Sequence, residues 1–369
     1  MEDKNTPQRH WQSRRKYLVI LLPVLLCLIC GGYLLYRSNA DGTMAGLRNG
    51  SDGSAGRNDP PGSITEYLRA SELVEEGRAA GTADGEIQTN AWADLCVPTY
   101  LARVQDTYFL VDCYHNQVIY NDNLQDPLSD WKVMTADLDK AHTLASDGTV
   151  YLIDDTERNR VLVFEKRGER FVHTQTFDNI GNRPHYIIYD PPADTFYAWS
   201  SMSGEMYLFR RDPEDSRMYL TEIRRVDSLD QVYVRSFTII GSNIYFVSGN
   251  SRILRADLES FEILETYPVP DSMAGMIQLT RIEDYFYITI STDITGSQEY
   301  ATMIRTKELS ALMEGDYEDV YGNFIGGGTP YYITQLEDAY YLTEHRLPGH
   351  SLWRFQVEDN EIVNVETVY

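Results

Sequence analysis

Short apolar stretches recur along residues 99–369, and this repetition constrains the fold more than any other feature of the chain. Each is preceded by one stretch of alternating or apolar residues and followed by another, with Asp, Gly, Asn and Ser between them. A further stretch completes every unit except the fifth, where "ELSALMEGDYEDVYGNFI" obscures it. The cores of the six units are "YFLVD", "VYLID", "FYAWS", "IYFVS", "FYITI" and "YYLTE". Because no helical periodicity separates these stretches, they indicate an all-β domain.

A repeat of about 40 to 55 residues with four strands per unit is typical of β-propeller blades. The sequence therefore predicts a six-bladed β-propeller over residues 99–369. The last unit contains its own four strands, so N-terminal residues need not complete it, although "GEIQTNAWADLC" could add an edge strand beside the first unit. A seven-bladed ring with one degenerate blade is the alternative.

The second unit carries the most specific motif, "GTVYLIDDTERNRVLVFEK". Its order of Gly, apolar strand, Asp, polar turn, Asn-Arg-Val and apolar strand resembles the NHL-type propeller repeat. The first unit, "YFLVDCYHNQVIYND", resembles the same repeat less completely. This resemblance implies architecture alone, since propellers of this kind include hydrolases, lyases, receptors and scaffolds, and function has to be argued from the site.

Residues 17–36, "YLVILLPVLLCLICGGYLLY", contain no charged residue and are long enough to cross a bilayer as one helix. Residues 1–16 are rich in Lys and Arg, whereas only Arg37 follows the apolar run closely. The positive-inside rule then predicts a single-pass protein of the cell membrane, with a cytoplasmic N-terminus and an extracytoplasmic C-terminal domain. A cleaved signal peptide, with Ser38 and Ala40 as the cleavage signal, is the alternative.

Two segments connect this predicted helix to the propeller. Residues 37–63 are mostly Gly, Ser, Asn, Asp and Pro, and they predict a flexible linker. Residues 64–98 form a lead-in segment, in which Ile64 and Leu68 stand at helical spacing and predict a short amphipathic helix.

Cys96 and Cys113 are the two cysteines outside the apolar run. A hairpin that turns near Gln105 would bring Cys113 close to Thr99 and hence to Cys96, so a disulfide at the start of the first blade is feasible. Two free thiols are the alternative.

The bulk composition excludes some function classes. A net charge of −24 argues against a nucleic-acid partner, because a phosphate-binding face needs clustered Lys and Arg. The sequence contains no G-x-S-x-G, no H-E-x-x-H and no phosphate-binding Gly loop before a helix. We therefore assign no catalytic residue and no metal ligand, and the identity of any cofactor is left open.

In a propeller the first strand of each blade lines the central channel, so aligning the six units predicts the channel residues. The alignment leaves a choice between Arg235 and Ser236 in the fourth unit. The predicted channel residues are Tyr100, His142, His185, Arg235, Gln278, Tyr331 and Tyr332. Such a polar funnel would bind a small anion, a sugar or a peptide terminus, with Arg235 as the charge partner.

Two other interpretations of the channel remain open. The two histidines resemble those of the NHL-type amidating lyase, in which channel histidines hold zinc, although this chain offers only two at matching positions. Alternatively, the polar residues simply face water that fills the channel. The loop "EHRLPGHS" in the last unit, with His345, Arg346 and His350, is a second candidate site.

Acidic residues follow several predicted strands. Asp112, Asp154, Asp155 and Asp293 could contribute to a calcium site, but they more simply cap turns through backbone hydrogen bonds. Arg160 is expected to pair with Asp154 or Asp155 in the same blade.

Taken together, these features predict a membrane-anchored, extracytoplasmic propeller that binds a ligand or partner at the cell envelope. The partner could be a glycan, a peptide or another protein. A metal-dependent lyase or hydrolase that uses the channel histidines is one alternative, and a purely structural scaffold is another.

Overall fold

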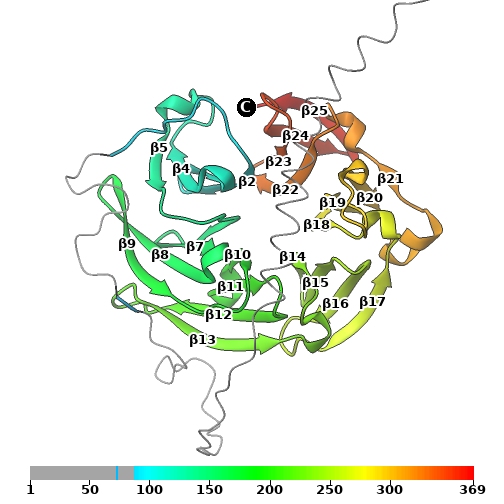
Figure 1. Cartoon of the computed structure of the whole chain (residues 1–369), viewed down its shortest axis with the longest axis horizontal. Coiled ribbons are helices and arrows are strands. Elements are labelled where there is room, and N and C mark those ends of the chain that lie inside the picture. The colour runs from blue at the N-terminus through cyan, green and yellow to red at the C-terminus, as the bar shows by residue number, and fades with distance from the viewer. Residues whose placement is uncertain (1–71, 74–86) are drawn as a thin grey trace, which may run out of the picture. The chain divides into compact units, whose positions relative to one another are not determined.

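The alternating stretches pair as antiparallel sheets around a common axis in the computed structural model, which describes residues 72–73 and 87–369 (Figure 1). The described residues form six sheets, so this part of the chain is a six-bladed β-propeller. Blades one to three contain β2 (Pro98–Val104), β3 (Thr107–Asp112), β4 (Gln117–Asn121) and β5 (Lys132–Thr135); β6 (Leu144–Ser146), β7 (Val150–Asp155), β8 (Arg160–Arg167) and β9 (Arg170–Phe177); and β10 (Pro184–Asp190), β11 (Thr195–Ser200), β12 (Glu205–Arg211) and β13 (Met218–Arg225).

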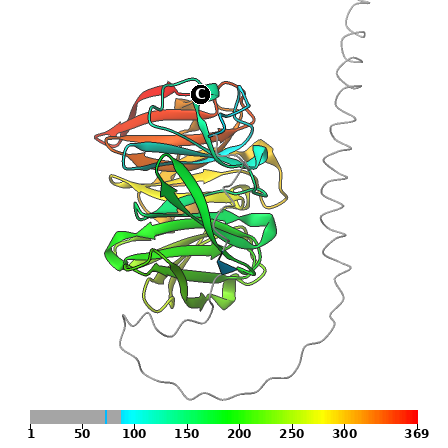
Figure 2. The ribbon, with the colours of Figure 1, turned by 90° about the vertical axis from the view of Figure 1, so that its left-hand side faces the viewer.

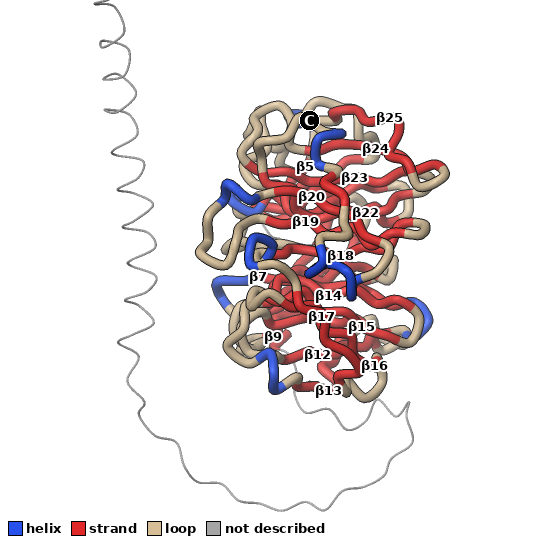
Figure 3. Tube along the Cα trace, turned by 90° about the vertical axis from the view of Figure 1, so that its right-hand side faces the viewer, coloured by secondary structure: helices blue, strands red, loops and turns tan. Residues whose placement is uncertain are grey.

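The second half of the ring repeats this arrangement. Blades four to six contain β14 (Val234–Ile240), β15 (Asn243–Ser248), β16 (Arg252–Asp257) and β17 (Ile263–Pro268); β18 (Met276–Ile282), β19 (Tyr285–Ile290), β20 (Thr302–Thr306) and β21 (Glu318–Asp319); and β22 (Thr329–Leu336), β23 (Ala339–His345), β24 (Leu352–Glu358) and β25 (Glu361–Thr367). Viewed from the side, strands run through the thickness of the ring and loops lie at its two faces (Figure 2, Figure 3).

Short 3-10 helices occur only in the connections of the described residues. They are η1 (Cys113–His115), η2 (Leu128–Asp130), η3 (Thr156–Arg158), η4 (Pro191–Ala193), η5 (Asp227–Leu229), η6 (Asp271–Met273), η7 (Gln298–Tyr300), η8 (Leu309–Glu314) and η9 (Tyr321–Asn323). Several of these turns carry the side chains of the candidate site described below.

The ring closes where β2 of blade one lies beside β22 of blade six (Figure 1). Among residues 72–73 and 87–369, no N-terminal strand enters blade six, as the self-sufficient last unit of the sequence predicts. The stretch before blade one contributes only an edge bridge, between Thr89 and Lys132. The C-terminal Tyr369 accepts a hydrogen bond from the indole of Trp131 in blade one, at 3.0 Å. Side-chain contacts, rather than a shared β-ladder, therefore hold the two ends of the ring together.

Every pair of neighbouring blades is joined by a side chain that lies within hydrogen-bond distance of a backbone carbonyl in the next blade. The six contacts, in ring order, are Thr99 Oγ1–His142 O (2.8 Å), Thr156 Oγ1–Pro184 O (2.7 Å), Trp199 Nε1–Val234 O (3.1 Å), Ser236 Oγ–Ile277 O (2.6 Å), Thr289 Oγ1–Tyr331 O (2.6 Å) and Thr343 Oγ1–Thr99 O (2.8 Å). Because these residues are buried, each contact gives a buried carbonyl a hydrogen-bond partner.

Apolar faces of adjacent blades pack around these polar contacts. Phe109 of blade one lies 5.3 Å from Tyr151 of blade two, and Trp199 of blade three lies 4.7 Å from Phe246 of blade four, measured between ring centroids. All four rings are buried. Burial of each such ring stabilises the fold by about 1.5–3 kcal/mol relative to exposure.

Asn159 and Arg160, from the sequence motif of blade two, have structural roles. Asn159 is left-handed (φ 52°), and its side chain accepts a hydrogen bond from the Arg183 amide of blade three, at 2.7 Å. Arg160 pairs with Asp155 at 2.6 Å, which confirms the expected ion pair within the blade. Asn116 of blade one repeats the role of Asn159 with the Lys140 amide, at 3.1 Å. These residues therefore build the junctions between blades.

Most of the predicted N-terminal features lie outside the described residues. These include the anchor at residues 17–36 and the linker at residues 37–63. Within the segment for which we expect a helix, Glu72–Leu73 instead form the short strand β1, which pairs with β9 at the outer edge of blade two. Among the described residues, no helix has the length and apolarity needed to cross a bilayer.

Replacing Thr343 by valine tests the closure of the ring. The variant keeps the side-chain shape but leaves the buried Thr99 carbonyl without its donor, so we expect the free energy of unfolding to fall by about 1–3 kcal/mol. Urea denaturation of the full-length protein measures this loss. Thr266→Val, on the exposed face of β17, is the matched control and should change stability by less than about 0.5 kcal/mol. Equal effects of the two substitutions would contradict the role of Thr343.

Candidate functional site

The structure divides the predicted channel residues into two layers along the axis. Tyr100, Gln278 and Tyr332, together with Tyr186, form the first, which we call the tyrosine layer. His142, His185, Arg235 and Tyr331, together with Tyr233 and His345, form the second, which we call the histidine layer. The histidine layer lies where the first strands begin, and the tyrosine layer is deeper.

The tyrosine layer fills the channel. Its rings contact one another with centroid distances of 6.4 Å for Tyr100–Tyr186, 6.1 Å for Tyr100–Tyr332 and 5.0 Å for Tyr186–Tyr332. The Gln278 amide is occupied by the backbone of Ile333, from which it accepts a hydrogen bond at 2.6 Å and to which it donates one at 3.1 Å. Burial raises the pKa of Tyr100 to about 12, so this phenol stays neutral. These side chains therefore pack the axis and leave little for a ligand to contact.

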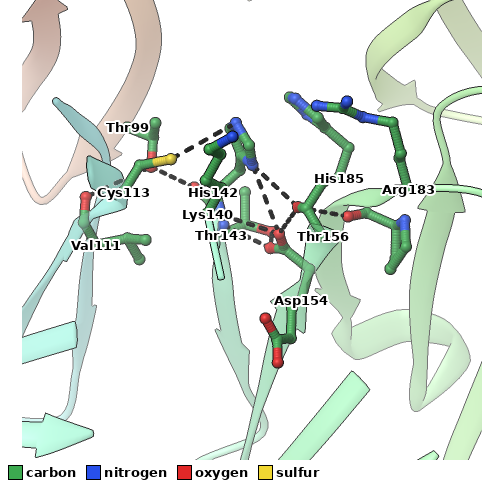
Figure 4. A network of polar contacts seen from close by, with 12 residues as sticks. Thr99, Val111, Cys113, Lys140, His142, Thr143, Asp154, Thr156, Arg183 and His185 are labelled. Atoms are coloured by element: carbon green, nitrogen blue, oxygen red, sulfur yellow. Dashed lines mark hydrogen bonds and ion pairs between the residues drawn. The ribbon is translucent and has the colours of Figure 1, made fainter. Parts of the chain in front are cut away.

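The histidine layer is a stack of rings from three blades. The imidazoles of His142 and His185 lie face to face, 3.7 Å apart (Figure 4). Tyr331 lies 6.1 Å from His142 on one side and stacks on His345 at 4.5 Å on the other. His345, which we placed in a hairpin loop of blade six, thus reaches the axis from the end of β23. It is a third histidine of the layer, and strand alignment missed it because it lies on a second strand.

Buried carboxylates fix the backbone that carries this layer. Asp154 accepts hydrogen bonds from the amides of His142 (2.8 Å) and Thr143 (2.6 Å) and from the Thr143 hydroxyl (2.7 Å) (Figure 4). Asp112 accepts from the amides of Cys96 (3.0 Å) and Val97 (3.1 Å) in the same way. The acidic residues after the strands therefore cap turns. Among the described residues, no three His, Cys, Asp or Glu side chains are grouped as a metal ion would require.

Both nitrogens of His185 have partners. Nδ1 lies 3.0 Å from the Arg235 carbonyl and 3.2 Å from the Tyr332 hydroxyl, and Nε2 lies 3.2 Å from the Tyr233 hydroxyl. Burial, reinforced by the nearby charges of His142, Arg235 and Arg183, holds the pKa of His185 well below its usual value. The ring is therefore neutral at physiological pH.

His345 is neutral for the same reasons. Burial, with His142 as the next cause, lowers the pKa of His345 to about 3. Its Nε2 lies 3.0 Å from the carbonyl of Pro98, so this nitrogen carries the proton and donates. Two neutral imidazoles thus border the axis beside a permanent positive charge.

That charge belongs to Arg235. Its guanidinium lies 4.5 Å from the centroid of the Tyr233 ring and donates to the Met276 carbonyl at 3.3 Å. It forms no ion pair with any carboxylate of the described part of the chain. Nearby, Arg183 and Lys140 share a single carboxylate, Glu157, at 3.0 Å and 3.6 Å. The mouth of the channel therefore carries an excess of positive charge.

Exposed aromatic side chains lie on blade one at the same face as this mouth. Tyr114 of η1 is 59% exposed, and the charges of Lys140 and Arg183 act on its hydroxyl. Trp92 is 49% exposed and stacks on His115 at 4.1 Å. Sequence alignment of first strands could not find these residues, because they lie in the lead-in segment and in a turn.

The predicted loop site of blade six is not a single cluster. Whereas His345 points to the axis, Arg346 binds loops at the face, donating to the Gly328 carbonyl at 2.7 Å and to the Gln298 side chain at 2.8 Å. His350 stacks on Trp353 at 5.4 Å and lies 3.3 Å from Thr367 of the outer strand β25.

Cys96 and Cys113 are both free, so the feasible disulfide is not formed in this structure. The Cys113 thiol is buried and points to His142, with 3.9 Å between Sγ and Nε2, whereas Cys96 is exposed (Figure 4). Burial, reinforced by Asp154 and Asp112, raises the pKa of Cys113 well above its usual value. It is a packed thiol of the channel rather than a reactive thiolate.

Comparison with known proteins supports the fold. No protein-family model matches the chain, and no curated protein sequence matches it. A proposed 6-phosphogluconolactonase from Bacteroides fragilis is 12% identical, with a TM-score of 0.53 over 72% of this chain and 82% of that one. Sqt1 of Saccharomyces cerevisiae is 9% identical, with a TM-score of 0.52 over 76% and 87%. A streptogramin B lyase is 15% identical, with a TM-score of 0.50 over 76% and 86%. At such identities the likeness shows a β-propeller and nothing about activity.

The depressed pKa of His345 predicts a loss of stability in acid. Its pKa is about 3 in the fold and about 6.5 in an unfolded chain, so protonation favours unfolding as the pH falls below about 6.5. Between pH 7 and pH 5 this histidine should cost about 2 kcal/mol. His345→Gln, which keeps a donor near Pro98, should remove that part of the pH dependence, as measured by urea denaturation at both pH values.

His350→Gln provides the control for loss of a histidine from the same loop, because His350 lies at the outer strands. If His345→Gln leaves the pH dependence of the wild-type protein intact, His345 is not the buried neutral group that the structure shows.

Proposed function

We propose that this chain is a membrane-anchored, extracytoplasmic propeller that binds an anionic group of a ligand or partner at the channel mouth. The observation that carries the proposal is Arg235, whose guanidinium has no carboxylate partner among the described residues. Three further observations support it: the neutral imidazoles beside it, the aromatic surface of Tyr114 and Trp92, and the apolar run at residues 17–36.

A partly buried cation without a counter-ion favours an anion from outside. The chain has 56 acidic and 32 basic residues, so carboxylates are abundant, yet none pairs with Arg235 in the described region. A guanidinium presents a planar set of donors that fits a carboxylate or phosphate through two parallel hydrogen bonds. Binding such an anion would offset the cost of desolvating the charge.

The surroundings of Arg235 favour a ligand with both a charge and a ring or chain to stack. His185 and His345 are neutral, so neither adds a charge beside Arg235. Tyr114 and Trp92 offer exposed rings at the same face, which suit a sugar ring or a peptide side chain. An acidic glycan, an acidic peptide or an acidic segment of an envelope protein meets these requirements.

A metal-dependent lyase or hydrolase receives less support from this geometry. His142 and His185 stack face to face, so their nitrogens do not converge on one point, and both nitrogens of His185 are hydrogen-bonded. His142 Nδ1 lies 3.0 Å from the Thr156 hydroxyl. Binding is therefore the function that the described side chains serve best.

Arg235→Gln tests the proposed function. Isothermal titration of the full-length protein in detergent would use three anionic probes: inorganic phosphate, citrate and an oligogalacturonate. Loss of a charged hydrogen-bonding partner costs about 1.5–3 kcal/mol, so we expect at least one probe to bind the wild type about 10- to 150-fold more tightly.

Arg281→Gln is the matched control, because Arg281 also stacks on an aromatic ring, at 4.6 Å from Phe286, but lies exposed at the far end of β18, away from the channel mouth where the first strands begin. It should leave affinity unchanged. The proposal fails if none of the probes binds at millimolar concentration or if both substitutions weaken binding equally, and a scaffold role would then be favoured.

The predicted orientation is tested separately. Trypsin added to intact cells should digest the propeller or release it, because the Lys and Arg distribution around residues 17–36 predicts that the C-terminal domain lies outside. Protection of the propeller until the cells are lysed would contradict the predicted topology.

A further inference from the structure

A second concave surface lies on blade five, at the outer part of its sheet. It is an open groove of about 510 Å³ between β20, η7, η6 and the segment around β21. Its walls include Met273, Glu299, Tyr300, Thr302, Tyr317 and Asp319. None of these residues belongs to the tyrosine or histidine layer, so the groove is distinct from the channel mouth.

The groove exists because the fourth strand of blade five is unusually short. β21 has two residues and pairs with β20 only at Ile304 and Arg305, with one further bond from the Val320 amide to the Met303 carbonyl, at 2.9 Å. The fourth strands of the other blades have four to eight residues. In blade five the chain forms the helix η8 instead. The short strand therefore leaves the groove on the outer side of β20, beside Ala301 and Thr302.

The walls of the groove are acidic and contain no basic residue. Asp319 is held in place, because it accepts hydrogen bonds from the Thr302 hydroxyl at 2.8 Å and from the Tyr321 amide at 3.0 Å. The Glu299 side chain forms no ion pair with a basic residue of the described chain. Two carboxylates thus face a groove that supplies no cation for them.

Aromatic and apolar side chains accompany these carboxylates. Tyr300 is 50% exposed, and Tyr317 packs on the core of blade five beside Ile304. Ile294 is 53% exposed and is tied to η6 by a hydrogen bond from its amide to the Asp271 carbonyl, at 2.8 Å. Exposed apolar side chains beside an acidic groove are typical of an interaction site.

We propose that this groove binds an extended basic peptide segment of a partner protein. The partner's backbone would lie in the groove beside Thr302 without pairing as a strand, because the Ala301 amide already donates to the Gln298 carbonyl at 3.2 Å and the Met303 carbonyl already accepts from Val320. A Lys or Arg side chain would lie between Glu299 and Asp319 and over the tyrosine rings, which attract cations. Charge complementarity selects this occupant, since a neutral or acidic segment would leave both carboxylates without a basic partner. The proposal is independent of the anion site at the channel.

Fluorescence anisotropy with a labelled peptide of sequence KVKVKV tests the groove. We expect saturable binding to the full-length protein that weakens with added salt, and no binding of the acidic peptide EVEVEV. Glu299→Gln combined with Asp319→Asn should raise the dissociation constant of KVKVKV about tenfold or more, because both charge partners are lost.

Three controls make the outcome decisive. Glu299→Lys alone, at an exposed turn residue, should abolish binding without affecting folding. Glu262→Gln, at an exposed hairpin of blade four, should leave binding unchanged. Arg235→Gln should also leave it unchanged, which separates this site from the channel.

The proposal is overturned if KVKVKV does not bind, if EVEVEV binds equally well, or if the groove variants bind like the wild type. It is also overturned if the neutral oligosaccharide cellohexaose binds, and if Tyr300→Ala weakens the binding of cellohexaose but not that of KVKVKV.

Discussion

One buried side chain at each blade junction places the first strand of the next blade, and the candidate site depends on these six contacts. The acceptor carbonyls belong to His142 and Tyr331 of the histidine layer, or to the residues next to His185, Arg235, Gln278 and Tyr100. The blades share no β-ladder, so these bonds, together with ring packing between blades, fix the height and rotation of every strand at the axis. Thr343 completes the circle, because it joins the last blade to the first.

Charged groups are distributed unevenly over the propeller. The molecule is strongly acidic, yet the axis holds a guanidinium with neutral imidazoles around it, and burial keeps those imidazoles neutral. Beside the short outer strand of blade five, in contrast, two carboxylates lack a basic partner. The two proposals therefore assign ligands of opposite charge to the two surfaces, an anion at the axis and a basic segment at the rim, which would let one propeller connect two partners.

The sequence predicts the fold because period-two alternation and turn residues report directly on strands. It predicts the axis less well, because the first strands of five blades contain a register shift, such as that between Pro98 and Tyr100, that alternation does not reveal. Because of this shift, Tyr100 lies in the tyrosine layer and His142 in the histidine layer, although the sequence alignment gives them the same position in their units. His345 and Tyr114 reach the mouth from a second strand and a turn, which no alignment of first strands includes. The fifth unit lacks a clear fourth strand in the sequence, and this irregularity marks the groove. In the structure "LSALME" forms the helix η8 there, and the fourth strand is short.

The most direct test of the central claim is to locate an anion in the protein. Crystals soaked in selenate, a tetrahedral oxyanion, would be measured at the selenium absorption edge. The account predicts an anomalous peak within hydrogen-bond distance of the Arg235 guanidinium, stronger than any peak at Arg354, which is already paired with Glu366 at 3.0 Å. Peaks at surface arginines with none at Arg235 would contradict an anion site at the channel mouth.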